Sequence, residues 1–336
     1  MFEQHYNLTV SPFRLTPDPQ FYFASETHQR AVAYLDYGLQ EGEGFAVLTG
    51  DVGTGKSTVI AHLLTRLERQ QVVVGRFSTS RLDDHDVLRL IARSFELAPA
   101  NDDKAYLLDL IGRFVADRRA RGQSVLLIVD EAQNLPLATL EELRMLTNAG
   151  PTGLPGLQCF LVGQSNFRAV IDLPEMEQLR QRVIASCHLE PLSLAETRRY
   201  IEHRLAIAGW QGRPQLGDDL IPSIYEATGG VPRLINMLLG RLLLFGALEQ
   251  RETLTNADCA EVVNDLEADF VTPTSAPGTP GTRGNGLDWA TAGLPALGAR
   301  VDRLEAIMSE LVDAVAVLLS RSRARQREGN DDARTN

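Results

Sequence analysis

The sequence predicts an α/β fold in which helices flank a parallel five-stranded sheet, followed by a smaller, all-helical domain. Two observations lead to this fold class. Segments that look like buried strands alternate with helical patterns up to about residue 190, which is typical of a parallel sheet covered by helices. After Pro191 the hydrophobic spacing is helical throughout. We therefore expect a sheet domain over residues 1–190 and a helical domain over residues 191–270.

Five short apolar runs are the candidate strands. Each has the length of a buried strand, and the first four are rich in branched or aromatic side chains. They are Phe45 to Thr49, Val72 to Phe77, Val125 to Val129, Gln158 to Val162 and, with the weakest pattern, Ala185 to Leu189.

Helix-start signals support the second domain. Ser193-Leu-Ala-Glu196 has the S-x-x-E spacing of a capping box. Gly229-Gly-Val-Pro232 places a proline at a first helical position, where its missing N–H costs nothing.

The composition changes after residue 270. Residues 271–296 are rich in Pro, Gly, Thr and Ala, which predicts a flexible linker. Over residues 297–323 apolar side chains follow spacings of three and four, which predicts an amphipathic helix. Such a helix either docks on its own domain or forms a coiled coil with another chain. Residues 324–336 are predicted to be a disordered tail.

The charge balance restricts the partners. With 33 basic and 44 acidic side chains, the formal net charge is -11. From Val271 onward eight arginines offset eight acidic residues, so the net negative charge lies in residues 1–270. Binding of DNA by the whole surface is therefore disfavoured, and any DNA contact would be local or made by an oligomer.

Composition also bears on location. No N-terminal stretch joins a basic flank to an apolar run, and the longest apolar stretch, Leu234 to Leu248, is interrupted by polar residues and glycine. We expect no transmembrane segment and a cytoplasmic protein, either free or peripheral to the inner membrane. Cys159, Cys187 and Cys259 are far apart and form no C-x-x-C pair, which favours reduced core residues.

A glycine-rich loop lies between the first predicted strand and a helix. It matches G-x-x-x-x-G-K-[ST], the phosphate-binding loop (P-loop) whose backbone N–H groups point at phosphate oxygens. Lys56 would contact the β- and γ-phosphates of ATP, and the Ser57 hydroxyl would bind Mg²⁺. The predicted nucleotide contacts of this loop are Gly50, Asp51, Val52, Gly53, Thr54, Gly55, Lys56, Ser57 and Thr58.

The third predicted strand ends in two acids, Asp130 and Glu131, in a Walker B pattern. Asp130 would hold Mg²⁺ through water, and Glu131 would polarise the water that attacks the γ-phosphate. The next strand ends at Gln164, whose amide could orient the same water.

Two further regions carry candidate arginines. The P-loop and the Walker B pattern together resemble those of AAA+ ATPases, whose rings carry an arginine before the last strand that enters the neighbouring subunit's site. Gln178-Leu-Arg180-Gln-Arg182 stands at the corresponding place in this sequence. We favour Arg182 over Arg180, with a surface salt bridge as the alternative for either. Arg233, one residue into its helix, would face the nucleotide. Near the N-terminus, Phe13 or a neighbour either stacks on the adenine or belongs to a purely structural strap.

Residues 7 to about 250 resemble one branch of the AAA+ ATPases, the general secretion pathway protein A (ExeA-like) proteins and the related ATPases of exosortase (PEP-CTERM) loci. The resemblance rests on Pro12-Phe13 with Thr16-Pro-Asp-Pro19, Leu48 to Ser57, Val129-Asp-Glu-Ala-Gln-Asn-Leu135, Leu161-Val-Gly-Gln164, Gln181-Arg182 and Gly229 to Asn236. It implies the same nucleotide roles for Lys56, Ser57, Asp130, Glu131, Gln164, Arg182 and Arg233. Secretion-pathway members typically continue into a membrane span and a periplasmic cell-wall-binding region, which residues 271–336 do not resemble.

The resemblance implies a Mg²⁺-dependent ATPase that acts as a switch or assembly motor in secretion or export of envelope polysaccharide or protein. It also implies a homo-oligomer with a trans-acting arginine and a partner in the export machinery at the membrane. The alternatives are a transposition ATPase of the TniB/TnsC type that binds duplex DNA, and a nucleotide-gated scaffold with little turnover.

Overall fold

The computed structural model describes residues 2–67, 71–79, 87–147 and 156–270. The predicted linker (271–296), amphipathic helix (297–323) and disordered tail (324–336) therefore lie outside the described residues. Residues Met1–Thr272 form one compact unit.

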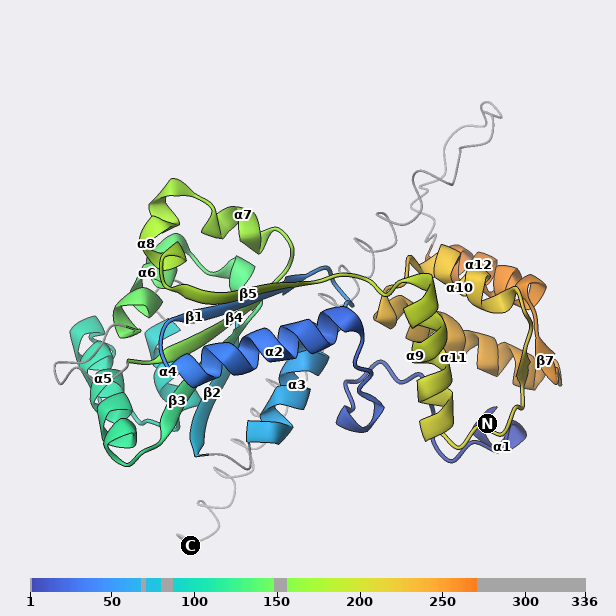
Figure 1. The fold of residues 1–336 in the computed structure, drawn as a ribbon, viewed down its shortest axis with the longest axis horizontal. Helices are drawn as coiled ribbons and strands as arrows, with labels where there is room; N and C mark the ends of the chain where they lie inside the picture. The colour runs from blue at the N-terminus through green and yellow to red at the C-terminus, as the bar shows by residue number, and fades with distance from the viewer. Residues whose placement is uncertain (1, 68–70, 80–86, 148–155, 271–336) are drawn as a thin grey trace, which may run out of the picture. The chain divides into compact units, whose positions relative to one another are not determined.

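A five-stranded parallel sheet forms the centre of the first domain, with the strand order β2-β3-β4-β1-β5 (Figure 1). All five strands that the sequence predicts are present, each extended by one or two residues. Their bounds are β1 Phe45–Gly50, β2 Val72–Ser78, β3 Ser124–Asp130, β4 Gln158–Gly163 and β5 Val183–Leu189. The predicted α/β fold class is confirmed.

Helices bury both faces of this sheet, which explains why its central strands, β1, β3 and β4, are buried without alternation. In β1, Phe45 and Val47 face one core cluster, while Ala46 and Leu48 face another. The second cluster is covered by α2 (Glu26–Glu41) and α3 (Lys56–Leu67). The first is covered by α4 (Val87–Ser94), α5 (Lys104–Ala120), α6 (Leu137–Leu146), α7 (Phe167–Ile171) and α8 (Glu177–Arg180). The result is a three-layer sandwich.

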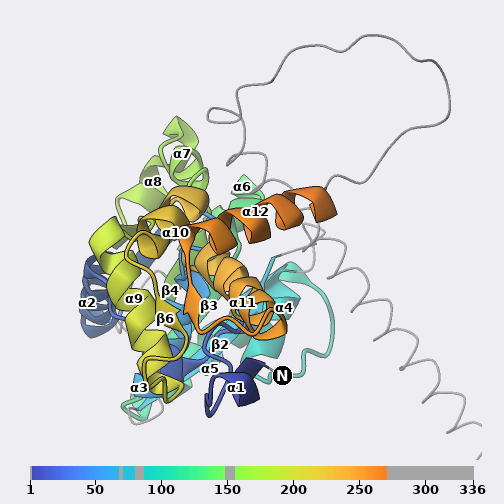
Figure 2. The same cartoon turned by 90° about the vertical axis from the view of Figure 1, so that its right-hand side faces the viewer.

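Four helices form the second domain, here called the lid (Figure 2). They are α9 (Leu194–Ile207), α10 (Leu220–Thr228), α11 (Pro232–Leu248) and α12 (Asn256–Phe270). The predicted capping box is present, because the Ser193 hydroxyl accepts from the Glu196 N–H and the Glu196 carboxylate accepts from the Ser193 N–H. Proline also stands at the first position of α11, as predicted.

The lid is not entirely helical. Two-residue strands, β6 (Gln215–Leu216) and β7 (Thr253–Leu254), pair in parallel. The Gln215 N–H donates to the Glu252 carbonyl at 2.8 Å, and the Gly217 N–H donates to the Leu254 carbonyl at 2.9 Å. Strands this short have no hydrophobic period, so no sequence pattern could predict them.

The N-terminal segment differs from the prediction, which placed it with the sheet domain. Tyr6, Leu8 and Phe13 are buried in the lid core. The Tyr6 hydroxyl donates to the Arg251 carbonyl at 3.1 Å, and the Thr9 N–H donates to the Ala208 carbonyl at 2.9 Å. The segment, which includes α1 (Phe2–His5) and the 3-10 turn η1 (Pro19–Phe21), joins the lid because its apolar side chains complete the core of α9–α12.

No helix among the described residues is long and apolar enough to cross a lipid bilayer.

The three core clusters predict which part of the chain folds by itself. All their buried members lie between Tyr6 and Leu266, so a chain ending at Phe270 should unfold cooperatively at the urea midpoint of the full chain. A control chain ending at Leu248 lacks Val262 and Leu266, each worth about 1.5–3 kcal/mol of burial, and should unfold at a lower midpoint. Circular dichroism during urea titration measures both. A lowered midpoint for the chain ending at Phe270 would contradict this assignment.

Candidate nucleotide-binding site

The P-loop, the two Walker B acids and Gln164 lie at one edge of the sheet. Strand β4 lies between β3 and β1, and all three run in parallel. Their carboxyl ends therefore lie side by side, with the P-loop after β1, Asp130 and Glu131 at the end of β3, and Gln164 just after β4. Crevices outside the carboxyl ends of parallel strands are where open α/β sheets bind ligands.

The P-loop conformation needs its glycines. Gly53 and Gly55 have φ angles of 83° and 102°, in the region that only glycine adopts without strain. A Cβ atom at Gly53 would lie 2.7 Å from the Arg233 Cβ, and one at Gly55 would lie 2.5 Å from the His28 Nε2. The side chains of Arg233 and His28 therefore pack directly against the P-loop backbone at these two glycines. Helix α3 begins at Lys56, so its N-terminal N–H groups and dipole favour an anion at this loop.

The side chains here fit a nucleotide with a hard cation. The Lys56 ammonium donates to the carbonyl oxygens of Gly50 and Asp51, at 2.7 and 2.9 Å, and so lies within the loop. Ser57 and Thr58, in the first turn of α3, line a cavity beside the P-loop. The Ser57 hydroxyl and the Asp130 carboxylate are oxygen ligands of the kind that Mg²⁺ prefers.

The turn that carries Glu131 is strained. Glu131 has a φ angle of 54°, which costs a residue other than glycine on the order of 1–3 kcal/mol and is found mainly at functional sites. Buried Thr79 holds the turn, because its hydroxyl donates to the Glu131 carbonyl at 2.6 Å and to the Asp130 carbonyl at 3.2 Å. Burial and the neighbouring Asp130 raise the pKa of the Glu131 carboxyl, while Lys56 lowers it. A raised pKa makes this carboxylate a better proton acceptor.

Asp130 forms an ion pair that the sequence does not predict. The Arg76 guanidinium of β2 lies 3.0 Å from the Asp130 carboxylate. A single exposed arginine on the outermost strand of a sheet gives no sequence signal. Only the pairing of β2 with β3 brings Arg76 and Asp130 together.

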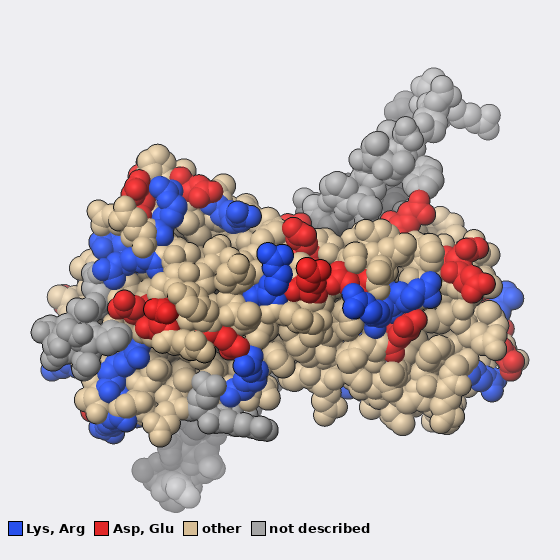
Figure 3. Space-filling model, viewed as in Figure 1, with Lys and Arg blue, Asp and Glu red and all other residues tan. Residues whose placement is uncertain are grey.

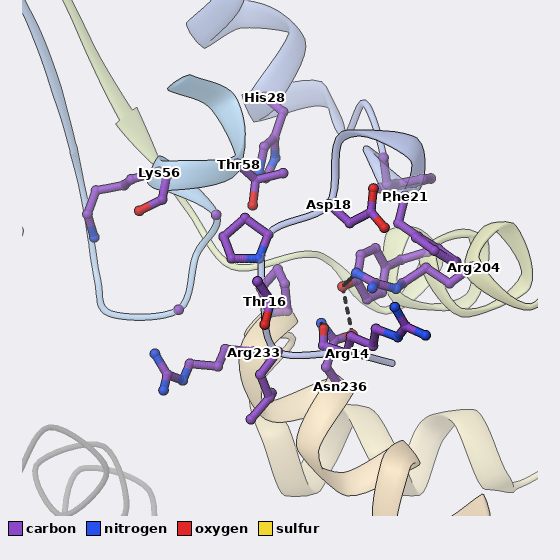
Figure 4. Close-up of a pocket in the computed structure, with 18 of the residues that line it drawn as sticks. Arg14, Thr16, Asp18, Phe21, His28, Lys56, Thr58, Arg204, Arg233 and Asn236 are labelled. Carbon is purple, nitrogen blue, oxygen red and sulfur yellow. Dashed lines mark hydrogen bonds between the residues drawn. The ribbon is translucent and has the colours of Figure 1, made fainter. Parts of the chain in front are cut away.

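A cavity opens between the P-loop, the N-terminal segment and the lid (Figure 4). Phe13, for which adenine stacking and a purely structural strap were the two alternatives, is buried in the lid core, whereas its neighbours Phe21 and Phe23 line the cavity. The buried Arg204 guanidinium lies 4.9 Å from the Phe21 ring centre, and its Nε donates to the Pro12 carbonyl at 2.5 Å. This arginine fastens the N-terminal segment to α9, and we did not predict it because nothing in its helical position distinguishes it from a solvated arginine.

The lid touches the P-loop directly through Arg233. Its backbone N–H, at the start of α11, donates to the Gly53 carbonyl at 3.2 Å. Figure 4 shows its side chain on the same side of the cavity as Lys56, with Arg204 and Phe21 on the other side. The predicted nucleotide arginine therefore adjoins the phosphate loop.

Arg182 lies at the opposite edge of the sheet. Its carbonyl accepts from the Phe45 N–H, at the start of β1, and the five steps from Phe45 to Gly50 span roughly 17 Å. The Arg182 guanidinium donates to the Thr147 carbonyl at 3.3 Å. Arg180 instead lies 3.3 Å from the Glu177 carboxylate, in the surface ion pair that was its alternative. Among the predicted site residues, Arg182 is thus the one that the fold keeps away from its own P-loop.

Charge on the outer surface is mixed. On the face shown in Figure 3, Lys and Arg side chains are interspersed with Asp and Glu side chains. Exposed pairs such as Arg66 with Asp36, at 2.8 Å, contribute to this pattern.

The sequence is similar to a family of AAA domains and to one curated secretion protein. A family described as AAA domain matches residues 39–171. Over 245 residues the chain is 38% identical to the general secretion pathway protein A of Aeromonas hydrophila, a match that covers 73% of this chain and 44% of that protein. The chain therefore spans less than half the length of this curated relative.

Solved structures share the fold at low identity. Cdc6p from Pyrobaculum aerophilum superposes with a TM-score of 0.58 at 17% identity, covering 81% of this chain and 74% of that chain. The ORC1 protein of Aeropyrum pernix, solved in complex with DNA, gives 0.57 at 18%, covering 78% and 70%. The RuvB Holliday junction branch migration motor of Thermotoga maritima gives 0.50 at 15%, covering 71% and 68%. At these identities the likeness concerns the fold alone.

The burial of His28 beside the P-loop predicts that the free energy of unfolding depends on pH. Burial lowers the pKa of His28 from 6.5 to about 4, although the Glu196 carboxylate and the Thr54 backbone oppose the shift. Because the folded-state pKa is the lower one, the unfolded chain takes up the proton first. The contribution of His28 is therefore complete above about pH 6.5 and is lost as the pH falls towards 4.

We expect the free energy of unfolding to fall by roughly 2 kcal/mol between about pH 7.5 and pH 5 on account of His28. Urea titrations of the wild type and of His28→Gln across this range measure the term, since other groups titrate equally in both. The two proteins should differ in slope, and parallel pH profiles would contradict a buried neutral His28.

Proposed function

We propose that the chain is an ATPase of the AAA class, related to the general secretion pathway protein A, and that it binds ATP with Mg²⁺ and hydrolyses it to ADP and phosphate. The observation that carries the proposal is the meeting of Lys56, Asp130, Glu131 and Gln164 at the carboxyl edge of β1, β3 and β4. Binding, charge neutralisation and water activation thus come from one edge of the sheet.

Each side chain has a separate task in this proposal. The P-loop N–H groups and Lys56 would bind the β- and γ-phosphates, while Ser57, and Asp130 through water, would hold Mg²⁺. Mg²⁺, when bound, would neutralise charge on the phosphate oxygens. Glu131 orients the attacking water and accepts its proton, in keeping with its raised pKa. Gln164 directs the same water from the end of β4.

Contacts between the lid and the P-loop would let the bound nucleotide control the position of the lid. Arg233 adjoins the P-loop through its backbone N–H, and its side chain lies on the same side of the cavity as Lys56 (Figure 4), which supports the proposal that it contacts the γ-phosphate. Loss of that phosphate on hydrolysis would weaken the hold of α11 on the nucleotide. We therefore assign the chain the role of a switch or assembly motor, with lid movement as its output.

The place of action rests on the curated relative, whose name assigns it to general secretion. We propose that the chain works in secretion or export of envelope polysaccharide or protein, as a homo-oligomer in the cytoplasm or at the inner membrane, with a partner in the export machinery. The distance of Arg182 from its own P-loop supports the oligomer. Duplex binding that weakens with salt would instead favour the transposition-type alternative.

Two substitutions separate binding from hydrolysis. Lys56→Ala removes the side-chain cation of the P-loop and should abolish ATP binding, whereas Glu131→Gln should bind ATP and lose turnover. Titration with a fluorescent ATP analogue and phosphate release measure the two properties. Lys104→Ala, which removes a lysine from the first turn of α5, serves as the control and should behave as wild type. Equal ATP affinity in Lys56→Ala and wild type would refute the P-loop assignment.

A mixing experiment tests whether Arg182 acts on a neighbouring subunit. Arg182→Ala should bind ATP normally but lose most turnover. Arg182→Ala keeps an intact P-loop and Lys56→Ala keeps an intact Arg182, so mixed oligomers of these two inactive variants should recover part of the activity. Arg180→Ala is the matched control and should need no complementation, because its guanidinium pairs with Glu177. Co-assembly in light scattering without recovered activity would exclude a trans-acting Arg182.

A further inference from the structure

The turn that follows β4 is held from both sides. It contains Gln164 and Ser165, and it lies between the Walker B turn after β3 and the P-loop after β1. On the Walker B side, the Gln164 N–H donates to the Gln133 side-chain carbonyl at 3.0 Å. On the P-loop side, the Ser165 hydroxyl donates to the Asp51 carboxylate.

Gln133 comes from the short 3-10 turn η2 (Ala132–Asn134), directly after Glu131. In the same turn, the Asn134 amide lies 3.5 Å from the Glu131 carboxylate. Two adjacent amide side chains thus extend from η2 towards the two residues proposed to act on the attacking water. The strained Glu131 backbone sets the direction in which η2 leaves the strand, and thereby where Gln133 reaches.

The contact made by Gln133 is to the backbone of Gln164. The Gln164 N–H is the first beyond the end of β4, so this hydrogen bond determines where the chain leaves the sheet and from which point the Gln164 side chain extends. Positioning of this kind matters in catalysis because small displacements of a group that orients a reactant cost much of its effect. A partly buried side-chain acceptor also keeps that N–H paired when water is excluded.

We propose that Gln133 is a positioning residue, which holds the Gln164 turn against the Walker B turn so that Gln164 and Glu131 address the same water. The proposal rests on the proposed ATPase function and adds a residue to it. Ser165 and Asp51 complete the arrangement by linking the same turn to the P-loop.

Gln133→Leu tests the proposal, because leucine has a similar size and lacks the acceptor. We expect kcat for ATP to fall about fivefold to tenfold, the effect of one hydrogen bond, with KM unchanged. Gln133→Glu retains a side-chain oxygen and should keep most of the activity. Gln133→Asn is one methylene shorter, should behave like leucine, and serves in its place if Gln133→Leu does not fold.

A double-mutant cycle distinguishes positioning from a general structural role. If Gln133 acts through Gln164, the double variant Gln133→Leu/Gln164→Ala should lose no more kcat than Gln164→Ala alone. Gln123→Leu is the matched control: Gln123 also accepts a hydrogen bond, from Arg118 at 3.3 Å, but it precedes β3 at the far edge of the sheet. It should leave kcat unchanged.

The outcomes are separable. If kcat is at the wild-type level in Gln133→Leu, or if the losses of the two single variants multiply in the double variant, the positioning role is overturned while the ATPase function stands. If Lys56→Ala and Gln164→Ala hydrolyse ATP like wild type, the proposed function itself is wrong, and with it the role of Gln133.

Discussion

The parallel pairing of β4 with β3 on one side and with β1 on the other is the constraint on which the candidate site depends. Asp130 and Lys56 are separated by more than seventy positions in the sequence. The two strand pairings bring their turns to one edge, because parallel strands in register end together. Helices on both faces then bury the central strands, and the P-loop, Asp130, Glu131 and Gln164 follow where these strands end.

Contacts join the P-loop to α2, to α11 and to the turn after β4. His28 of α2 lies against Gly55, Arg233 of α11 donates to Gly53, and Ser165 donates to Asp51. Each contact uses a different position of the loop, and two of them need a glycine. If a nucleotide moved the P-loop, these contacts would transmit the movement to the lid and to the turn after β4. This gives the proposed switch a physical basis.

The N-terminal segment couples the lid to the sheet domain in a second way. Its first residues complete the lid core, and Arg204 holds Pro12 and lies over the Phe21 ring. Residues 14–18 then cross the cavity beside the P-loop (Figure 4). The cavity thus has walls from three parts of the chain, and its shape depends on how the lid is held.

Local and periodic features were predictable from the sequence. The five strands are short apolar runs, the capping box is a four-residue signal, and Gly50 to Ser57 with Asp130 and Glu131 is a motif whose chemistry is tied to its spacing. Contacts between distant segments were not. The reach of Gln133 to Gln164, the pairing of Arg76 with Asp130 and the burial of Phe13 in the lid depend on strand order and core packing, and the same side chains in another arrangement would face solvent. The sequence by itself determined which chemistry the chain carries and along which strands it lies. Only the tertiary structure decided which side chains hold that chemistry in place, because hydrogen bonds and close packing act over a few ångströms and are indifferent to separation along the chain.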